Sequence, residues 1–234
     1  AWRALRSLGR EAGRHWLYEA TVGAGLPVIT TLRDMVQTGD RVERVEGVLS
    51  GTLSYVFNRF DGQRPFSEVV REARALGYTE PDPRDDLSGV DVARKLVILA
   101  REMGVEIELA DVVIESLVPP SATGPMTPEA FLDALRASDD AMEARRAEAA
   151  ARGACLRYVG VVDAQGRARV SLAEYPFAHA FGALSATDNV IAFTSARYQR
   201  QPLIVRGPGA GAEVTAGGVF ADLLRLAAWL GTTT

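Results

Sequence analysis

The chain has 234 residues, 47% of them hydrophobic and 24% charged, which are ordinary proportions for a globular protein with a sizeable core. Its net charge of -4 and its lack of a basic tract argue against nucleic acid as a partner, and no apolar run is long enough to cross a membrane. The single cysteine, Cys155, excludes an internal disulfide and is typical of a cytoplasmic protein.

The first part of the chain is predicted to be mainly helical. Pro27 and Ser67 stand where helices commonly begin, because proline suits the first helical position and serine can cap free amides. Helices are expected over residues 1–14, 27–38, 51–59, 67–77 and 90–103. Strands are expected over 15–19 and 42–50.

The second part is predicted to mix strands with helices. Thr127 and Pro128 form a helix start, and this helix is expected to end by Gly153 with a break near Ser138. The other expected elements are an extended run over 107–117, a hairpin of 156–162 and 168–172, strands over 190–194 and 203–205, and an apolar helix over 215–230. We therefore expect an α+β fold in which helices cover one face of a mixed β-sheet.

Residues 78–95 combine an acidic loop with the start of a helix. Two prolines restrict the loop backbone and should hold the carboxylates of Glu80 and Asp82 in place. Asp91 and Lys95 are spaced i, i+4 and share one face of the helix. A lysine at the mouth of an ordered acidic loop can transfer protons, but a solvent-exposed Asp–Lys pair has the same spacing and is the commoner case.

The turn over residues 22–27 has two chemical interpretations. Gly23 and Gly25 permit backbone angles that let carbonyl oxygens converge on one point. Such oxygens, together with the carboxylate of Glu19, suit a hard cation. The alternative is a tight turn in which Glu19 caps nearby amides, and the sequence alone favours neither.

A second glycine-rich segment, 207–211, opens into the last predicted helix. Glycines let the backbone approach a ligand closely, and a helix amino end favours anionic or polar groups. A plain strand-to-helix turn needs similar residues, so the motif by itself is weak.

Four segments together resemble the homoserine dehydrogenase family. They are residues 19–27 (EATVGAGLP), 47–55 (GVLSGTLSY), 78–95 (YTEPDPRDDLSGVDVARK) and 207–216 (GPGAGAEVTA). The third contains the family pattern of a Glu-Pro-Asp-Pro loop followed by Gly-x-Asp-x-x-x-Lys. The stretch 106–160, with its extra helical segment, is most similar to the dehydrogenase half of bifunctional aspartokinase–homoserine dehydrogenases.

The resemblance implies the NAD(P)-dependent interconversion of L-homoserine and L-aspartate 4-semialdehyde. Lys95 would be the catalytic acid and base, and Glu80 and Asp91 would bind the ammonium group of the substrate. Three further residues would line the substrate pocket: Gly51, Thr52 and Tyr78.

The resemblance also implies two bound cofactors. NADP or NAD would contact the glycine-rich segment, at Gly209 and Gly211. A sodium ion would be held by the carboxylate of Glu19 and by three main-chain oxygens, those of Val22, Ala24 and Leu26.

The family pattern includes a Rossmann domain, whose Gly-x-Gly-x-x-Gly fingerprint this sequence lacks. We therefore expect that domain, and an aspartokinase domain, upstream of residue 1. Residues 1–205 would form the catalytic and dimerisation region of a homo-oligomer, and residues 206–234 the glycine loop and a helix that packs on the nucleotide-binding domain. Two alternatives remain: a substrate-binding or dimerisation module that is inactive alone, and a metal-dependent lyase or hydrolase that binds Mg²⁺ with the acids of 80–86.

Overall fold

Six strands form one sheet in the computed structural model, which describes residues 2–231. Their bounds are Val42–Val48 (β1), Val112–Ile114 (β2), Ala154–Asp163 (β3), Ala168–Pro176 (β4), Asp188–Ser195 (β5) and Leu203–Pro208 (β6). The strand order is β2-β4-β3-β1-β5-β6, in which β2 runs parallel to β4 and every other neighbouring pair is antiparallel. The expected mixed sheet is confirmed.

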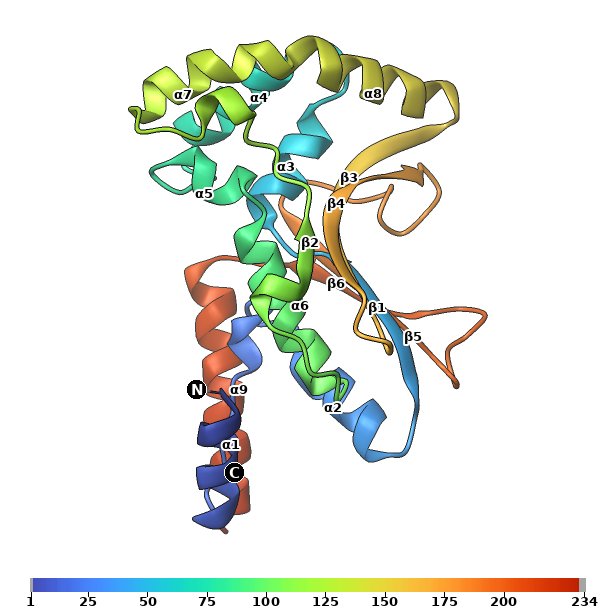
Figure 1. The fold of residues 1–234 in the computed structure, drawn as a ribbon. Coiled ribbons are helices and arrows are strands. Elements are labelled where there is room, and N and C mark those ends of the chain that lie inside the picture. Colours follow the sequence, from blue (N-terminus) through green and yellow to red (C-terminus); the bar gives the residue numbers. More distant parts are fainter. Residues whose placement is uncertain (1, 232–234) are drawn as a thin grey trace.

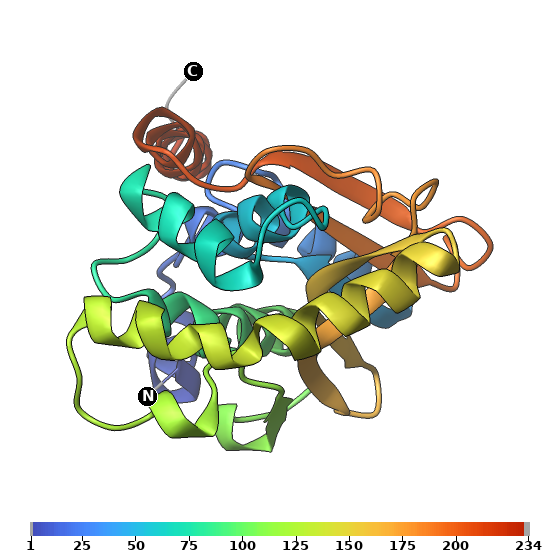
Figure 2. The same cartoon turned by 90° about the horizontal axis from the view of Figure 1, so that it is seen from above.

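The α-helices gather largely on one side of this sheet (Figures 1 and 2). They are Trp2–Glu11 (α1), Val28–Gln37 (α2), Gly51–Arg59 (α3), Phe66–Ala75 (α4), Pro83–Leu87 (α5), Val90–Glu102 (α6), Pro128–Ala134 (α7), Asp139–Ala151 (α8) and Ala212–Trp229 (α9). Short 3₁₀ helices cover Glu19–Thr21, Leu109–Asp111, Pro120–Ala122 and Leu135–Ser138. The main core lies between α2–α8 and the sheet, and a smaller apolar cluster lies on the opposite face, where the loop 177–187 folds back.

Helix α6 carries the Asp91–Lys95 pair of the predicted motif and is fixed by its apolar stripe. Val92, Leu96 and Leu99 are buried in the main core. Gly160 on β3 lets the helix approach the sheet, because a side chain there would meet Val92 at 3.3 Å. Packing of this stripe turns the other face of the helix, with Lys95, away from the sheet centre.

Gly89 makes the sharp turn from α5 into α6. It adopts φ 74°, a left-handed conformation that glycine tolerates, and a side chain there would overlap the hydroxyl of Tyr158. That hydroxyl donates a hydrogen bond of 2.6 Å to the carbonyl of Glu115. The turn is therefore locked against the sheet, which fixes where α6 begins.

The structure corrects four local predictions. No strand forms over 15–19, where a 3₁₀ helix begins at Glu19 instead. Ser67 lies inside α4 and does not cap it, because its hydroxyl donates to Asp139 at 2.7 Å. Within 107–117 the strand is limited to Val112–Ile114, and the acidic loop contains a short helix, Pro83–Leu87.

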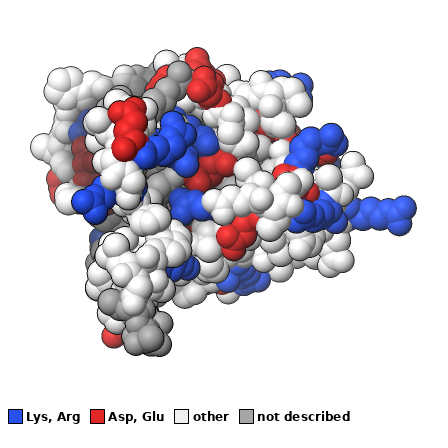
Figure 3. Space-filling model, turned by 90° about the horizontal axis from the view of Figure 1, so that it is seen from below, with Lys and Arg blue, Asp and Glu red and all other residues white. Residues whose placement is uncertain are grey.

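Helix α9 projects beyond the sheet (Figure 1). Much of its apolar surface is exposed. Its exposed apolar side chains are Val219, Phe220, Leu223, Leu224 and Trp229. Basic and acidic side chains alternate over the main body in Figure 3, whereas the lobe at its lower left is almost uncharged. No helix within residues 2–231 is both long and apolar enough to cross a membrane.

Candidate active site

Lys95 is held by two oxygens, one from Asp91 on its own helix and one from the backbone at the end of the central strand. Its Nζ lies 2.8 Å from Oδ2 of Asp91 and donates to the carbonyl oxygen of Leu49 at 2.9 Å. Leu49 follows β1 directly and is fully buried. The side chain of Lys95 is 22% exposed and that of Asp91 55%. The lysine is therefore anchored to the fold and does not extend into solvent as an ordinary surface pair does.

An acidic hollow of about 650 Å³ opens beside this lysine. Its polar lining comes from the loop after α4, from α5 and from the start of α6: Glu80, Asp85, Asp86, Ser88, Asp91, Arg94 and Lys95. Four carboxylates face two cations, so the hollow favours a ligand with a positively charged group. The predicted residues Glu80, Asp91 and Lys95 do lie together.

Asp86 belongs to this hollow and was not predicted as a site residue. Burial raises the pKa of its carboxyl, and the charges of Glu80 and Asp91 add to the rise, while hydrogen bonds from the Glu80 amide and from Thr52 oppose it. The Glu80 amide donates to its Oδ2 at 2.9 Å. Asp82 caps α5 and Pro83 occupies its first turn, a start signal that places Asp86 on a helix and was available in the sequence.

Gly51 and Thr52 begin helix α3, next to the acidic segment, but among the described residues the lining of the hollow includes neither of them, nor Tyr78. The hydroxyl of Ser50 accepts from the amide of Leu53 at 3.2 Å and so caps this helix. Thr52 donates from its hydroxyl to the carbonyl of Tyr78 at 2.6 Å, which ties the helix to the acidic segment. Of the three predicted pocket residues, Thr52 therefore adjoins a carboxylate of the hollow, that of Asp86.

The glycine-rich segment meets the same end of α3. A side chain at Gly51 would lie 3.9 Å from the side chain of Ala210. Gly209 lies against the side chain of Asn189, so closely that any Cβ there would overlap the Asn189 amide. Gly211 adopts φ 119° at the start of α9. The segments predicted to bind cofactor and substrate are thus neighbours in space.

Glu19 caps helix α2 from a buried position. Its carboxylate accepts from the amide of Ile29 at 2.7 Å and from the amide of Thr30 at 3.0 Å, and Arg225 of α9 lies 3.5 Å away. The carbonyl of Leu26 already accepts from the amide of Val28 at 2.8 Å. This is the arrangement that the capping interpretation describes.

The turn that carries Val22, Ala24 and Leu26 packs against the glycine-rich segment and α9. A Cβ at Gly207 would lie 3.0 Å from Leu26, and one at Gly25 would overlap the carbonyl of Val214. Residues 22–27, 47–55, 78–95 and 207–216 therefore converge on one end of the sheet, although they are far apart in the sequence.

Lys95 is the sole lysine of the chain, since the other basic residues among its 26 lysines and arginines are all arginine. Arginine keeps its proton under all ordinary conditions, whereas a lysine amine can release and regain one. Apart from His15 and His179, position 95 thus carries the one basic side chain of the sequence that is not a guanidinium.

Comparison with known proteins identifies the family of the chain. The model of the homoserine dehydrogenase family matches residues 27–224. The chain belongs to the homoserine dehydrogenase family. Within that family it is 57% identical to a bifunctional aspartokinase/homoserine dehydrogenase from Zea mays, over 97% of the chain but 25% of the relative. It spans about a quarter of that relative's length.

Two solved structures from this family illustrate the fold of the chain. A putative homoserine dehydrogenase from Archaeoglobus fulgidus is 31% identical, with a TM-score of 0.78, and the match covers 96% of the chain and 62% of the structure. A hyperthermophilic archaeal homoserine dehydrogenase in complex with NADPH is 21% identical, with a TM-score of 0.73 over 100% of the chain and 61% of the structure. The mixed sheet and its helices are therefore those of homoserine dehydrogenases.

Proposed function

We propose that the polypeptide carrying this chain interconverts L-homoserine and L-aspartate 4-semialdehyde with NADP or NAD. The observation that carries the proposal is the position of Lys95, the chain's sole lysine, held between Asp91 and the Leu49 carbonyl at the mouth of an acidic hollow. Membership of the homoserine dehydrogenase family supports the reaction class.

The lining of the hollow supports binding of an amino acid by its ammonium group. Glu80 and Asp91 supply carboxylates for that group, and Asp86 adds negative charge beside them. Gly51, Thr52 and Tyr78 border the space where the rest of the substrate would lie. Homoserine bound in this way brings its hydroxyl towards Lys95.

Lys95 exchanges the proton of the reaction. On oxidation of homoserine, the neutral amine of Lys95 takes the proton of the substrate hydroxyl. The carbon that bears this hydroxyl loses a hydride in the same step, and the aldehyde forms. In the reverse direction the ammonium form returns that proton to the carbonyl oxygen. The bonds to Asp91 and Leu49 orient Nζ throughout, which keeps the proton acceptor at a fixed point.

The glycine-rich segment fits a nicotinamide dinucleotide. Half-buried Gly209 and exposed Gly211 lie just before the amino end of a helix, and the Asn189 amide beneath Gly209 has no hydrogen-bond partner within residues 2–231. The nicotinamide supplies the chemistry of hydride transfer when it is bound. Gly209 and Gly211 are the residues of this chain that would hold it.

A sodium ion near Glu19 remains part of the proposal. The oxygens of Val22, Ala24 and Leu26 belong to the turn that packs against the glycine-rich segment, so a cation there would brace the binding loops and take no part in the reaction. It would compete with Arg225 for the carboxylate of Glu19.

Exposed apolar side chains support the remaining partners, which are further domains of the same polypeptide and a second copy of the chain. The exposed apolar residues of α9 suit contact with a nucleotide-binding domain of the same polypeptide, which would pack on residues 206–234. An aspartokinase domain is the other expected partner, and the name of the maize relative includes one. Val113 and Ile204 lie exposed on the sheet face opposite the helices, which suits the expected homo-oligomer. In both cases apolar side chains would leave water.

The test uses the full-length polypeptide that carries residues 1–234. Reduction of NADP or NAD is followed by absorbance with L-homoserine, and with L-serine and L-threonine as matched amino-alcohol controls. We expect homoserine-dependent reduction that survives a chelator of divalent metals. A purified, folded polypeptide that reduces neither cofactor, or that instead hydrolyses or cleaves a substrate in a Mg²⁺-dependent way, would exclude this function.

A further inference from the structure

Asn189 is a fully buried polar side chain whose hydrogen-bonding groups are not satisfied. It is the second residue of β5 and has 0% exposure. Neither its amide nitrogen nor its amide oxygen has a partner within the described chain. Leaving a buried polar group unpaired typically costs about 1–3 kcal/mol, so such groups are rare in native proteins.

Another buried polar residue on the same strand shows the usual situation. Ser195 also has 0% exposure, but its hydroxyl donates to Asp40 at 2.7 Å and accepts from the amide of Tyr198 at 3.1 Å. The fold therefore satisfies a buried polar group at one end of β5 and leaves one unsatisfied at the other.

The unsatisfied end is the one that touches the proposed cofactor loop. Asn189 pairs with Gly207 in the sheet register, and its amide lies directly against Gly209. Only glycine leaves room for it there, since any Cβ would overlap the amide. Thr187, two residues before Asn189, lies against Gly51 at the amino end of α3. Asn189 thus stands between the loop 207–211 and the substrate-binding end of the sheet.

We propose that Asn189 is a positioning residue for the loop 207–211. When a nicotinamide dinucleotide binds, the side-chain carboxamide of Asn189 forms hydrogen bonds with the backbone around Gly209. These bonds fix the loop against the ligand. The unsatisfied amide raises the free energy of the unliganded form, and its satisfaction adds to cofactor affinity. This inference rests on the proposed function and adds a residue to it that no glycine motif contains.

The decisive variant is Asn189→Leu, which removes the amide and nearly conserves side-chain size. In the full-length polypeptide we expect an unchanged or higher Tm without ligand, because an unpaired polar group leaves the core. The Kd for NADPH, measured by fluorescence titration, should rise about tenfold, a change of about 1.4 kcal/mol. The KM for homoserine at saturating NADP should change by less than about threefold, roughly 0.6 kcal/mol.

Ser195→Ala is the matched control on the same strand. It should lower the Tm, because Asp40 and Tyr198 lose a partner, and it should leave the Kd for NADPH unchanged. Gly209→Ala forces the loop off the amide and should weaken NADPH binding as Asn189→Leu does.

The two proposals fail in different ways. A lower Tm or loss of folding in Asn189→Leu would mean that the amide is already satisfied in the free protein and would overturn the inference, as would an unchanged Kd for NADPH. A wild-type polypeptide that binds NADPH tightly but does not oxidise homoserine, with Asn189→Leu weakening that binding, would support the role of Asn189 and overturn the proposed function.

Discussion

The ammonium group of Lys95 donates to the carbonyl oxygen of Leu49 across 2.9 Å, which joins the middle of the active-site helix to the end of the central strand. Asp91 takes a second donor at 2.8 Å. A lysine ammonium group has three N–H donors. Within residues 2–231 two of them are used by Asp91 and Leu49, so the third can bind a ligand. Nζ is therefore oriented by the fold before any ligand arrives.

Replacement of Lys95 is expected to abolish turnover. Lys95→Ala removes the proton acceptor and should lower kcat by about 10²- to 10⁴-fold, the usual contribution of general acid–base catalysis. Lys95→Arg keeps the charge opposite Asp91 but cannot give up a proton, so its kcat should fall almost as far. Steady-state rates with both cofactors, and NADPH binding by fluorescence, measure the effect.

An ordinary helical ion pair provides the control for Lys95. Arg136 pairs with Asp133 at i, i+3 and both side chains are well exposed. Arg136→Ala should leave kcat unchanged. If Lys95→Ala stays within tenfold of wild type, the Asp91–Lys95 pair is a surface feature and the catalytic assignment is wrong.

Asp86→Asn should stabilise the protein at neutral pH. Because the pKa of Asp86 is raised in the folded protein, the folded state binds this proton more readily than the unfolded chain. Ionisation then costs folding free energy as the pH rises through the folded pKa, and the cost vanishes below about pH 3.9, the ordinary value for an aspartate. We expect a higher Tm at pH 7, no gain near pH 3.5, and a KM for homoserine about tenfold higher, some 1.4 kcal/mol.

The pKa of Asp82 is shifted in the opposite direction from that of Asp86, so its replacement should have the opposite effect on stability. The hydrogen bond from Arg84 lowers the pKa of Asp82, so its stabilising contribution is present at neutral pH and is lost as the pH falls through that lowered value. Asp82→Asn should therefore lower the Tm at pH 7. Equal shifts of the same sign in the two variants would contradict the electrostatic account of the hollow.

Glu19→Gln distinguishes the two interpretations of the turn 22–27. Loss of the charged cap on α2, together with the contact to Arg225, should cost about 1–2 kcal/mol in urea unfolding. If the site also holds sodium, NaCl should raise the Tm of the wild type above its value in choline chloride, and Glu19→Gln should lose that difference. Arg225→Ala, which leaves the carboxylate in place, should keep it.

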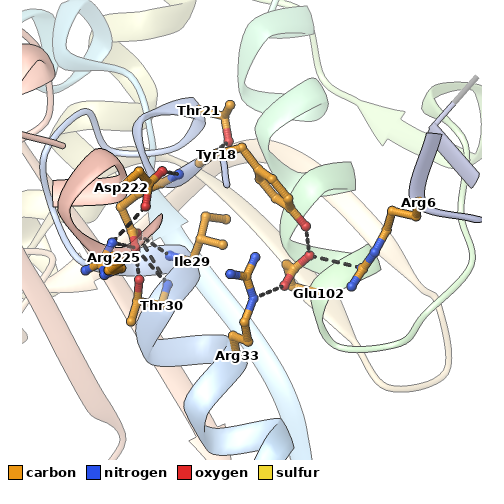
Figure 4. A network of polar contacts seen from close by, with 10 residues as sticks. Arg6, Tyr18, Thr21, Ile29, Thr30, Arg33, Glu102, Asp222 and Arg225 are labelled. Atoms are coloured by element: carbon orange, nitrogen blue, oxygen red, sulfur yellow. Dashed lines mark hydrogen bonds and ion pairs between the residues drawn. The ribbon is translucent and has the colours of Figure 1, made fainter. Parts of the chain in front are cut away.

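Glu102 is expected to be essential for stability. Its side chain is 3% exposed, pairs with Arg6 at 3.3 Å and Arg33 at 3.4 Å, and accepts from the hydroxyl of Tyr18 (Figure 4). Burial, followed by the bond to Glu102, raises the pKa of Tyr18 to about 12. Glu102→Ala leaves Arg6 and Arg33 without this carboxylate and should lower the free energy of unfolding, measured by chemical denaturation, by about 3 kcal/mol.

Asp133 is the exposed counterpart of Glu102. It also faces two arginines, Arg71 and Arg136, but its side chain is 65% exposed. Asp133→Ala should cost less than about 1 kcal/mol. A similar loss in the two variants would show that burial does not control the strength of the Glu102 network.

Local patterns in the sequence predicted the elements that depend on neighbours along the chain. The apolar stripe of α6, the Thr127–Pro128 helix start and the break near Ser138 all reappear in the structure. The hairpin of β3 and β4 is confirmed as well. In each case the decisive contacts or caps involve residues close in sequence or a simple periodicity.

The failures concern contacts between distant segments. Residues 15–19 have a strand-like composition but find no partner strand in the described sheet. The sequence predicts Ser67 as a helix cap, but its hydroxyl donates a hydrogen bond to Asp139, which lies 72 residues away along the chain. Such choices depend on tertiary packing, which no window of sequence contains.

The presence of one lysine among many arginines gives this stretch a spectroscopic handle. Reductive methylation with ¹³C-formaldehyde can place a dimethyl label within residues 1–234 only on that ε-amine and on a free amino terminus, if the stretch is prepared with one. The resulting isolated NMR resonance would follow the protonation of the proposed catalytic amine directly through a titration, without subtraction of any other lysine.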